Sequence, residues 1–327
     1  MRVMFQSRII PIIILLALLV AMPLLSACGS TEVPATNAPA QETTAVAKAE
    51  FDVVKAAVAG YLGDKASNVK AADLNMRIAD GDAPYIVSLR SADDYAAGHI
   101  PGAVNLKFGE LSTLPMGEEI LVYCYTGQSA SFAAATLGVL EYDVSNLLHG
   151  MASWSDNPDV YKKRFDPAKS QGSFATETTP NTGGSYALPV IDNSASNDDA
   201  EIIAAAAATV APKYIASKDL NVKIAEGEDM TIVSVRAADA YAAGHIPGAI
   251  NIGLGSLADN LSQINPDAPV YVYCYTGHSA AQTTALLQML GYDAYSVSFG
   301  MCGWTGDTSV NMDKCFTPEM SQGLDTE

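Results

Sequence analysis

The chain has 327 residues, of which 36 are acidic and 18 are basic, and its formal net charge at pH 7 is -18. A charge of this sign and size opposes binding to nucleic acid and to anionic lipid headgroups, so we expect neither as a partner. Hydrophobic residues make up 49% of the chain, enough for packed cores in more than one domain.

The first 28 residues have the pattern of an export signal. Arg2 and Arg8 precede an apolar run over residues 9–20, which is shorter than the roughly 20 residues of a transmembrane helix. The run leads to Leu-Ser-Ala-Cys, ending at Cys28, which resembles the bacterial lipoprotein box. That resemblance implies lipidation of Cys28, so that acyl chains attach an exported protein to the outer face of the cell membrane or within the cell envelope. Ordinary secretion with an incidental cysteine is the alternative.

An internal repeat sets the domain organisation. The sequence YAAGHIPGAVN at residues 95–105 returns as YAAGHIPGAIN at 241–251, and VYCYTGQSA at 122–130 returns as VYCYTGHSA at 272–280. The repeating unit of about 115 residues is far longer than the units of solenoid proteins, so we predict two duplicated globular domains.

Composition distinguishes the segments between and around the repeats. Residues 28–50 are rich in Ala, Thr, Pro and Glu, and residues 167–198 are rich in Ser, Thr, Asn and Gly, which is typical of flexible chain. The predicted organisation is a signal peptide at 1–27, a tether at 28–50, domain 1 at 51–166, a linker at 167–198, domain 2 at 199–317 and a loose tail at 318–327.

Each repeat carries two short apolar segments of the kind that forms buried strands. They cover residues 85–89 and 120–124 in the first repeat and 231–235 and 270–274 in the second. A loop and a helical stretch follow the later segment of each pair. This alternation predicts an α/β fold, in which each domain is a parallel sheet with helices on both faces, and sites form beyond the carboxyl ends of the strands.

Cys124 and Cys274 stand at two of these predicted strand ends, and each begins a short loop before a helix. Backbone amides in such a loop can point inward, and the helix N-terminus adds the positive end of its dipole. This environment favours the thiolate that nucleophilic attack requires, and it stabilises the terminal sulfur of a persulfide. Gly127 and Gly277 permit the positive φ that such a turn needs.

The six-residue loop that begins with a strand-end cysteine, together with the upstream Gly-His-Ile-Pro-Gly-Ala motif, resembles the rhodanese family over nearly all of both repeats. The resemblance implies that persulfides on Cys124 and Cys274 move sulfane sulfur. The donor would be a small sulfur-containing anion such as thiosulfate, and the acceptor a thiol or a cyanide-like nucleophile. A non-catalytic module that binds sulfane sulfur or docks a protein is the second hypothesis.

Departures from the family pattern bear on the substrate. Residues 125–129 and 275–279 contain none of the arginines that many thiosulfate-using members carry in this loop, and Ser88 and Ser234 stand where the family often has Asp. The missing loop arginine weakens the case for thiosulfate as the donor. It also argues against the phosphatases of related fold, which bind phosphate through such an arginine.

Anion binding is therefore expected to rest on the backbone amides of the loops. The predicted substrate-binding residues are Tyr125, Thr126, Gly127, Gln128, Ser129, Tyr275, Thr276, Gly277, His278 and Ser279, helped by Arg90 and Arg236. The two arginines either orient the substrate or pair with Asp93, Asp94 or Asp239. No nucleotide or flavin motif is present, so we expect no cofactor, and Cys274 with His278 supplies too few ligands for a metal site.

Two further cysteines, Cys302 and Cys315, occur only in the second repeat. Their joint presence favours a disulfide, which an exported location permits. The alternative is that Cys302 is a resolving thiol for Cys274. A disulfide would require Cα atoms within about 7 Å of each other.

Overall fold

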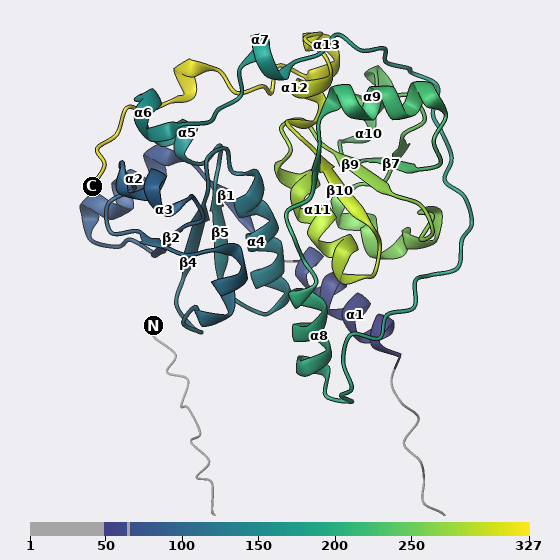
Figure 1. Ribbon diagram of the computed structural model, residues 1–327, viewed down its shortest axis with the longest axis horizontal. Helices are drawn as coiled ribbons and strands as arrows, with labels where there is room; N and C mark the ends of the chain where they lie inside the picture. The colour runs from purple at the N-terminus through teal and green to yellow at the C-terminus, as the bar shows by residue number, and fades with distance from the viewer. Residues whose placement is uncertain (1–48, 64–65) are drawn as a thin grey trace, which may run out of the picture. The chain divides into compact units, whose positions relative to one another are not determined.

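The computed structural model describes residues 49–63 and 66–327 (Figure 1). The predicted signal peptide, the predicted lipidation site Cys28 and the predicted tether up to residue 48 lie outside the described residues. Among the residues that are described, no helix is both long enough and apolar enough to cross a lipid bilayer.

Domain 1 is built on a parallel five-stranded sheet with the order β1-β5-β4-β2-β3. Its strands are β1 (Ser67–Val69), β2 (Tyr85–Ser88), β3 (Val104–Asn105), β4 (Ile120–Tyr123) and β5 (Val144–Leu147). Its helices are α1 (Glu50–Gly63), α2 (Ala71–Asp80), α3 (Ala92–Ala96), the 3-10 helix η1 (Phe108–Thr113), α4 (Gln128–Val139), α5 (Met151–Trp154) and α6 (Pro158–Tyr161).

Domain 2 repeats this sheet with the order β6-β10-β9-β7-β8, again parallel throughout. Its strands are β6 (Tyr214–Ile215), β7 (Thr231–Ser234), β8 (Ile250–Asn251), β9 (Val270–Tyr273) and β10 (Ala294–Val297). Its helices are α8 (Asp199–Ala208), α9 (Ser217–Glu226), α10 (Ala238–Ala243), the 3-10 helices η2 (Leu254–Asp259) and η3 (Leu261–Gln263), α11 (His278–Met289), α12 (Gly300–Trp304) and α13 (Thr308–Asn311). The predicted α/β fold is confirmed.

The central strands are buried on both faces, as the continuous apolar runs predict. In β4, the side chains of Ile120 and Val122 pack with α4, whereas those of Leu121 and Tyr123 pack with α2 and α5 on the opposite face. The sheet of domain 2 is covered in the same way, by α11 on one face and by α9 and α12 on the other. Helices on both faces leave the carboxyl ends of the strands as the place where loops can form a site.

The two domains meet along α4 and α11, which lie side by side (Figure 1). One apolar cluster joins side chains of both helices to α1 and α8, so the contact between the domains is a shared core. The carboxylate of Glu50, the first residue of α1, accepts hydrogen bonds from the amides of Asn193 and Ser194 at 2.7 and 2.9 Å. Residues far apart in the sequence thus hold the start of α1 in place.

The segment that follows domain 1 packs on domain 2. After the short helix α7 (Pro167–Ser170), the amide of Gly172 donates to the carbonyl of Gly303 at 2.8 Å, and Glu177 exchanges two backbone hydrogen bonds with His245. The indole Nε1 of Trp304 donates to the carbonyl of Ala175 at 2.8 Å. This part of the predicted linker is therefore fixed along the second repeat.

The C-terminal segment makes the matching contacts on domain 1, so the prediction of a loose tail at 318–327 is wrong. The tail begins with the 3-10 helix η4 (Pro318–Met320), and beyond it the amide of Gln322 donates to the carbonyl of Ser153 at 3.0 Å. Glu327 exchanges two backbone hydrogen bonds with His99. Figure 1 shows this segment running to the side of domain 1, where the C-terminus lies near α2 and α3. The segment that follows each repeat therefore packs on the other repeat.

Candidate functional site

Cys124 and Cys274 lie directly after the central strands β4 and β9, at the carboxyl ends of the two sheets. Both are free cysteines, and they are only 2% and 4% exposed. We call residues 124–129 loop 1 and residues 274–279 loop 2. Each loop leads straight into a helix, because α4 begins at Gln128 and α11 at His278.

Loop 2 directs a backbone donor at its thiol. The amide of Gly277 donates to Sγ of Cys274 at 3.1 Å, and Gly277 has a φ of 94°, which a residue with a side chain rarely adopts. Gly127 has a φ of 81° at the same position of loop 1. Because α11 starts at the next residue, the positive end of its dipole reinforces the donor. This geometry stabilises negative charge on the cysteine sulfur.

In each domain, a turn that contains a glycine follows the neighbouring strand, β5 or β10, and forms a hydrogen bond to the carbonyl group of the cysteine. The amide of Met151 donates to the carbonyl of Cys124 at 2.9 Å, and the amide of Met301 donates to that of Cys274 at 2.8 Å. A Cβ atom on Gly150 would lie 2.4 Å from the carbonyl oxygen of Cys124, so this close approach requires glycine. The Gly-Met pair of each repeat therefore positions the cysteine.

Arg90 and Arg236 bind backbone carbonyl groups, whereas the sequence predicted that they bind a substrate or pair with a carboxylate. Arg90 is 3% exposed, and its guanidinium donates to the carbonyls of Gly98 at 2.8 Å and Val160 at 2.7 Å. Arg236 is 2% exposed and makes equivalent contacts in domain 2. These contacts assign both arginines a structural role, in which they tie the strand end to the turns around it.

The two loops interlock across the domain interface through their fifth residues. The side-chain oxygen of Gln128 in loop 1 accepts a hydrogen bond from the amide of Phe299 in domain 2 at 3.1 Å. In the reverse direction, Nε2 of His278 in loop 2 lies 3.3 Å from the amide nitrogen of His149 and 3.0 Å from the carbonyl oxygen of Thr126. His149 and Phe299 are equivalent residues of the two repeats, and both have positive φ. The interlock was not predicted from the sequence.

Both histidines at this interface are neutral. Burial lowers the pKa of His278 to about 3, with charge on His149 as a second cause, and burial lowers the pKa of His149 to about 4. The Nδ1 atom of His278 lies 2.7 Å from the hydroxyl of Thr276. A neutral ring can donate from Nε2 to Thr126 while accepting from Thr276, or accept from the His149 amide while donating to Thr276. Either tautomer keeps loop 2 attached to domain 1.

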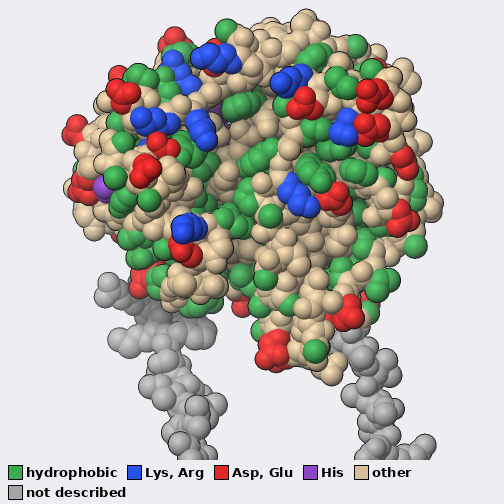
Figure 2. All heavy atoms as spheres, viewed as in Figure 1, with side chains coloured by type: hydrophobic (Ala, Val, Ile, Leu, Met, Phe, Trp, Pro, Cys, Tyr) green, Lys and Arg blue, Asp and Glu red, His purple; other side chains and the backbone are tan. Residues whose placement is uncertain are grey.

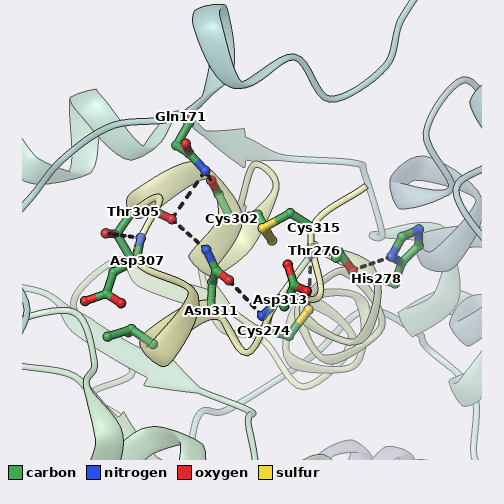
Figure 3. Close-up of a disulfide and its surroundings, with 12 residues drawn as sticks. Gln171, Cys274, Thr276, His278, Cys302, Thr305, Asp307, Asn311, Asp313 and Cys315 are labelled. Carbon is green, nitrogen blue, oxygen red and sulfur yellow. Dashed lines mark hydrogen bonds between the residues drawn. A yellow bond between two sulfur atoms is a disulfide. The ribbon is translucent and has the colours of Figure 1, made fainter. Parts of the chain in front are cut away.

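A disulfide joins Cys302 to Cys315, with their Cα atoms 5.4 Å apart (Figure 3). This is the pairing that the sequence favoured, and a bonded Cys302 cannot act as a resolving thiol. The disulfide belongs to an apolar cluster with Phe165 of domain 1 and Phe316 of domain 2. A cavity about the size of one water molecule remains between the loops, lined by Thr126, His149, Ala152, Phe165, Thr276, Phe299, Cys302 and Phe316.

A larger cleft of about 570 Å³ opens beside loop 2 and is lined by both domains. Tyr275 and Thr276 form its loop side, and Lys70 and Lys314 bring positive charge to it. Near loop 1, Nζ of Lys163 lies 4.5 Å from the ring centroid of Tyr125. Figure 2 shows several Lys and Arg side chains over the region of α5, α6 and α7, with acidic side chains among them and across the rest of this face. Local cations thus stand near both loops of an acidic protein.

Comparison with known proteins identifies the repeated domain. The family model of the rhodanese-like domain matches residues 70–157 and 217–307. The chain is 42% identical over 78 residues to the thiosulfate sulfurtransferase GlpE of Pseudomonas putida (strain GB-1), covering 24% of this chain and 71% of that protein. It is 29% identical over 87 residues to the putative sulfur carrier protein YrkF of Bacillus subtilis, covering 26% of this chain and 47% of that protein.

Solved structures include one of a rhodanese-like domain protein from Staphylococcus aureus, with 33% sequence identity and a TM-score of 0.28. That alignment covers 29% of this chain and 93% of the other. The two matches to the family model cover more than half of the chain and coincide with the two sheets that end at Cys124 and Cys274. The chain therefore belongs to the rhodanese-like domain family and carries two copies of the domain in tandem.

Proposed function

We propose that the protein is a sulfurtransferase that moves sulfane sulfur through persulfides on Cys124 and Cys274. The observation that carries this proposal is the hydrogen bond of 3.1 Å from the Gly277 amide to Sγ of Cys274. A donor fixed on the sulfur favours the thiolate, which is the nucleophile, and equally favours a persulfide anion in its place. Relatives named thiosulfate sulfurtransferase support the same chemistry.

The reaction has two displacement steps. The cysteine thiolate attacks the outer sulfur of a donor such as thiosulfate, the sulfur–sulfur bond of thiosulfate breaks, and sulfite leaves with the bonding electrons. The acceptor, cyanide or a thiolate, then attacks the outer sulfur of the persulfide. The bond to the cysteine breaks, and the cysteine leaves as the thiolate that began the cycle.

The cations beside the loops take the place of loop arginines in attracting an anionic donor. Lys163 lies over the ring of Tyr125 in loop 1 and stands between Lys162 and Arg164 in the sequence, whereas the second repeat has Met312, Asp313 and Lys314 at those positions. Opposite charge near the thiol raises the local concentration of an anion even when the whole protein is negative. We therefore propose that Cys124 is the better acceptor of sulfur from an anionic donor.

We also propose that the protein acts outside the cytoplasm, held to the membrane through a lipid on Cys28. The support is the signal-like sequence of residues 1–27 and the Leu-Ser-Ala-Cys box that ends at Cys28. The disulfide between Cys302 and Cys315 is consistent with an oxidising compartment. Labelling with a radioactive fatty acid tests this proposal, because incorporation should disappear in Cys28→Ala.

The test of the activity is thiosulfate-to-cyanide sulfur transfer by the full chain, its Cys124→Ser and Cys274→Ser variants and the double variant. We expect partial loss in each single variant and complete loss in the double variant. Mass spectrometry after exposure to donor should show a gain of about 32 Da for each cysteine that holds a persulfide. Equal activity in the double variant and the parent chain would disprove the assignment of both cysteines.

A second candidate function is binding of sulfane sulfur without turnover. The low exposure of both thiols, 2% and 4%, is the observation that favours it, because an acceptor must reach the outer sulfur. In that case the mass increment would appear, but cyanide would not remove it.

A further inference from the structure

The side chain of Gln128 in domain 1 lies directly against Gly277 in loop 2 of domain 2. A Cβ atom on Gly277 would lie 2.4 Å from Oε1 of Gln128 and 2.8 Å from its Cδ atom, so only glycine permits this close approach. Gly277 is also the residue whose amide donates to Sγ of Cys274 at 3.1 Å. Gln128 therefore contacts, across the domain interface, the residue that supplies the hydrogen-bond donor of this thiol.

The amide group of Gln128 is held at both of its polar atoms. Its Nε2 atom donates to the hydroxyl of Thr126 at 3.2 Å, and its Oε1 atom accepts from the backbone amide of Phe299 at 3.1 Å. The side chain is buried, with an exposed fraction of 5%. Because one hydrogen bond lies within loop 1 and the other reaches domain 2, Gln128 presents a fixed surface to Gly277.

A second route connects Gln128 to Cys274 through the turn at Phe299. Phe299 precedes Gly300, on which a Cβ atom would lie 2.4 Å from the carbonyl oxygen of Cys274. The amide of Met301 donates to that same carbonyl at 2.8 Å. The hydrogen bond from Phe299 to Gln128 thus holds the turn that packs against the strand end of Cys274.

We propose that Gln128 is a positioning residue for the Cys274 site: its side chain fixes Gly277 and the turn at Phe299, so that the Gly277 amide points at the anionic sulfur of Cys274. The inference deepens the proposed function and rests on Cys274 being a nucleophile. A donor that is fixed beforehand needs no reorganisation when the thiolate or the persulfide anion forms. Since Gln128 begins α4, domain 1 completes the site of domain 2.

The site of domain 1 has a histidine where the site of domain 2 has this glutamine. A Cβ atom on Gly127 would lie 2.4 Å from Nε2 of His278. The same nitrogen lies 3.0 Å from the carbonyl oxygen of Thr126, which belongs to the peptide unit of the Gly127 amide. Within the described residues, no amide donates to Sγ of Cys124. The glutamine and the amide donor thus occur together at one cysteine, Cys274.

The test compares Gln128→Met with the parent residue in the full chain that carries Cys124→Ser. Alkylation of Cys274 by iodoacetamide is followed across pH by mass spectrometry of the peptide that contains it, because only the thiolate reacts. The ultraviolet absorbance of the thiolate gives the midpoint independently of access to the sulfur, after subtraction of the spectrum of the matched chain that also carries Cys274→Ser. Neither readout needs sulfur transfer, so failure of this inference is distinguished from failure of the proposed function.

Gln282→Met is the matched control, because Gln282 is a second buried glutamine that joins the two domains. Its Oε1 atom accepts from the hydroxyl of Tyr61 at 3.4 Å, and its Nε2 atom donates to the carbonyl of Ala66 at 3.5 Å. These contacts are with α1 and with the segment before β1. Gln282→Met therefore reports the effect of a weaker domain interface on Cys274.

We expect Gln128→Met to move the midpoint of the Cys274 profile upward and to slow its alkylation at neutral pH about three- to tenfold, while Gln282→Met changes the rate less than about twofold. Gln128→Asn, whose amide is too short to contact Gly277 and Phe299 together, should move the midpoint in the same direction and serves as the test where the methionine variant does not fold. An unchanged midpoint in the Gln128 variants, whatever the rate of alkylation, would overturn the proposal. Equal shifts in Gln128→Met and Gln282→Met would do the same.

Discussion

The side chain of Gln128 accepts a hydrogen bond of 3.1 Å from the backbone amide of Phe299, although the two residues belong to different domains. The contact is matched by His278 and His149 in the opposite direction, so each thiol loop reaches into the turn that supports the other. Residues 149 and 299 precede the glycines that pack against the cysteine carbonyls. A disturbance of one loop is therefore transmitted to the strand end of the other.

Gln128→Ala should destabilise the domain interface. The substitution leaves the amide of Phe299 without its partner in a partly buried place, which costs about 1 kcal/mol. We expect a melting temperature lower by several degrees, and reduced alkylation of Cys274 as well as Cys124. Gln263→Ala is the control, because its side-chain amide donates to Oδ1 of Asn260 within domain 2 at 2.6 Å. Equal stability of the two variants would contradict the role of the interlock.

Removal of residues 322–327 should destabilise domain 1 and leave domain 2 nearly unchanged. The segment supplies a hydrogen bond of 2.8 Å from Nε1 of Trp154 to the carbonyl of Asp325, besides its backbone bonds, each worth roughly 0.5–1.5 kcal/mol. In a Trp304→Phe background, fluorescence of Trp154 should shift to the red as water reaches the indole. A red shift seen only in the Trp154→Phe background, where Trp304 is the reporter, would contradict this prediction, because it would show that the tail stabilises domain 2.

The sequence predicted the parallel sheets and the position of both cysteines because these depend on local signals. Apolar runs mark the buried strands, and a glycine in a short loop before a helix marks the turn. The exchanged terminal segments could not be predicted in this way. Residues 172–177 and 322–327 make many of their contacts through backbone groups, which every sequence has, and each segment offers only one large apolar side chain, Phe174 or Leu324, which is too few for a periodic pattern.

The site also contains residues whose role depends on contact between domains. The phenol oxygen of Tyr214 in domain 2 lies 2.8 Å from Oγ of Ser129 in loop 1, 85 positions away, and neither a motif nor its spacing connects the two. Arg90 and Arg236 show the reverse case. A basic residue after a strand end suggested substrate binding, but the structure buries each guanidinium among carbonyl groups of its own domain. Packing, and not residue type, decided these roles.

Acid should weaken the domain interface through His278 and His149. Their folded-state pKa values of about 3 and about 4 lie below the ordinary value of 6.5, so the unfolded chain binds more protons than the folded chain between pH 6.5 and about 4. The free energy of unfolding therefore falls as the pH falls through that window. In His278→Gln, the amide side chain can still accept from His149 but does not titrate.

Melting temperatures measured at neutral pH and at about pH 4.5 test this prediction. We expect a smaller acid-induced decrease in His278→Gln than in the parent chain. Asn193→Gln is a control for a polar change elsewhere, because it leaves both histidines in place. Identical decreases in parent and His278→Gln would show that titration of His278 does not contribute to the acid sensitivity.

Loss of the disulfide should lower stability with little direct effect on the thiols. Cys302 and Cys315 are 13 positions apart, and closing a loop of that size stabilises a protein by about 3 kcal/mol. A reductant should therefore lower the melting temperature of the parent chain, but not that of the Cys302→Ala, Cys315→Ala double variant. A melting temperature of the parent chain that does not respond to reductant would contradict this account, provided that free-thiol titration shows the bond reduced.

Lys163→Asp should impair capture of an anionic donor at Cys124. The second repeat has Asp313 at this position, so the substitution places beside loop 1 the negative charge that the second repeat carries at the equivalent position. Nζ of Lys163 lies 4.5 Å from the ring centroid of Tyr125, close enough to act on an anion entering loop 1. In a Cys274→Ser background, we expect KM for thiosulfate to rise about three- to tenfold at low salt with little change in kcat. The reason is that the charge of residue 163 affects binding of the anion more than it affects the chemical step.

Added salt should reduce the difference between Lys163→Asp and the parent residue, since the Debye length shrinks from about 30 Å at 0.01 M to about 8 Å at 0.15 M. Lys223→Asp on α9 changes the net charge by the same amount at a place where the lysine pairs with Glu228. If the two variants raise KM equally, the overall charge governs capture. If only Lys163→Asp does so, the basic segment after α6 attracts the anionic donor to loop 1.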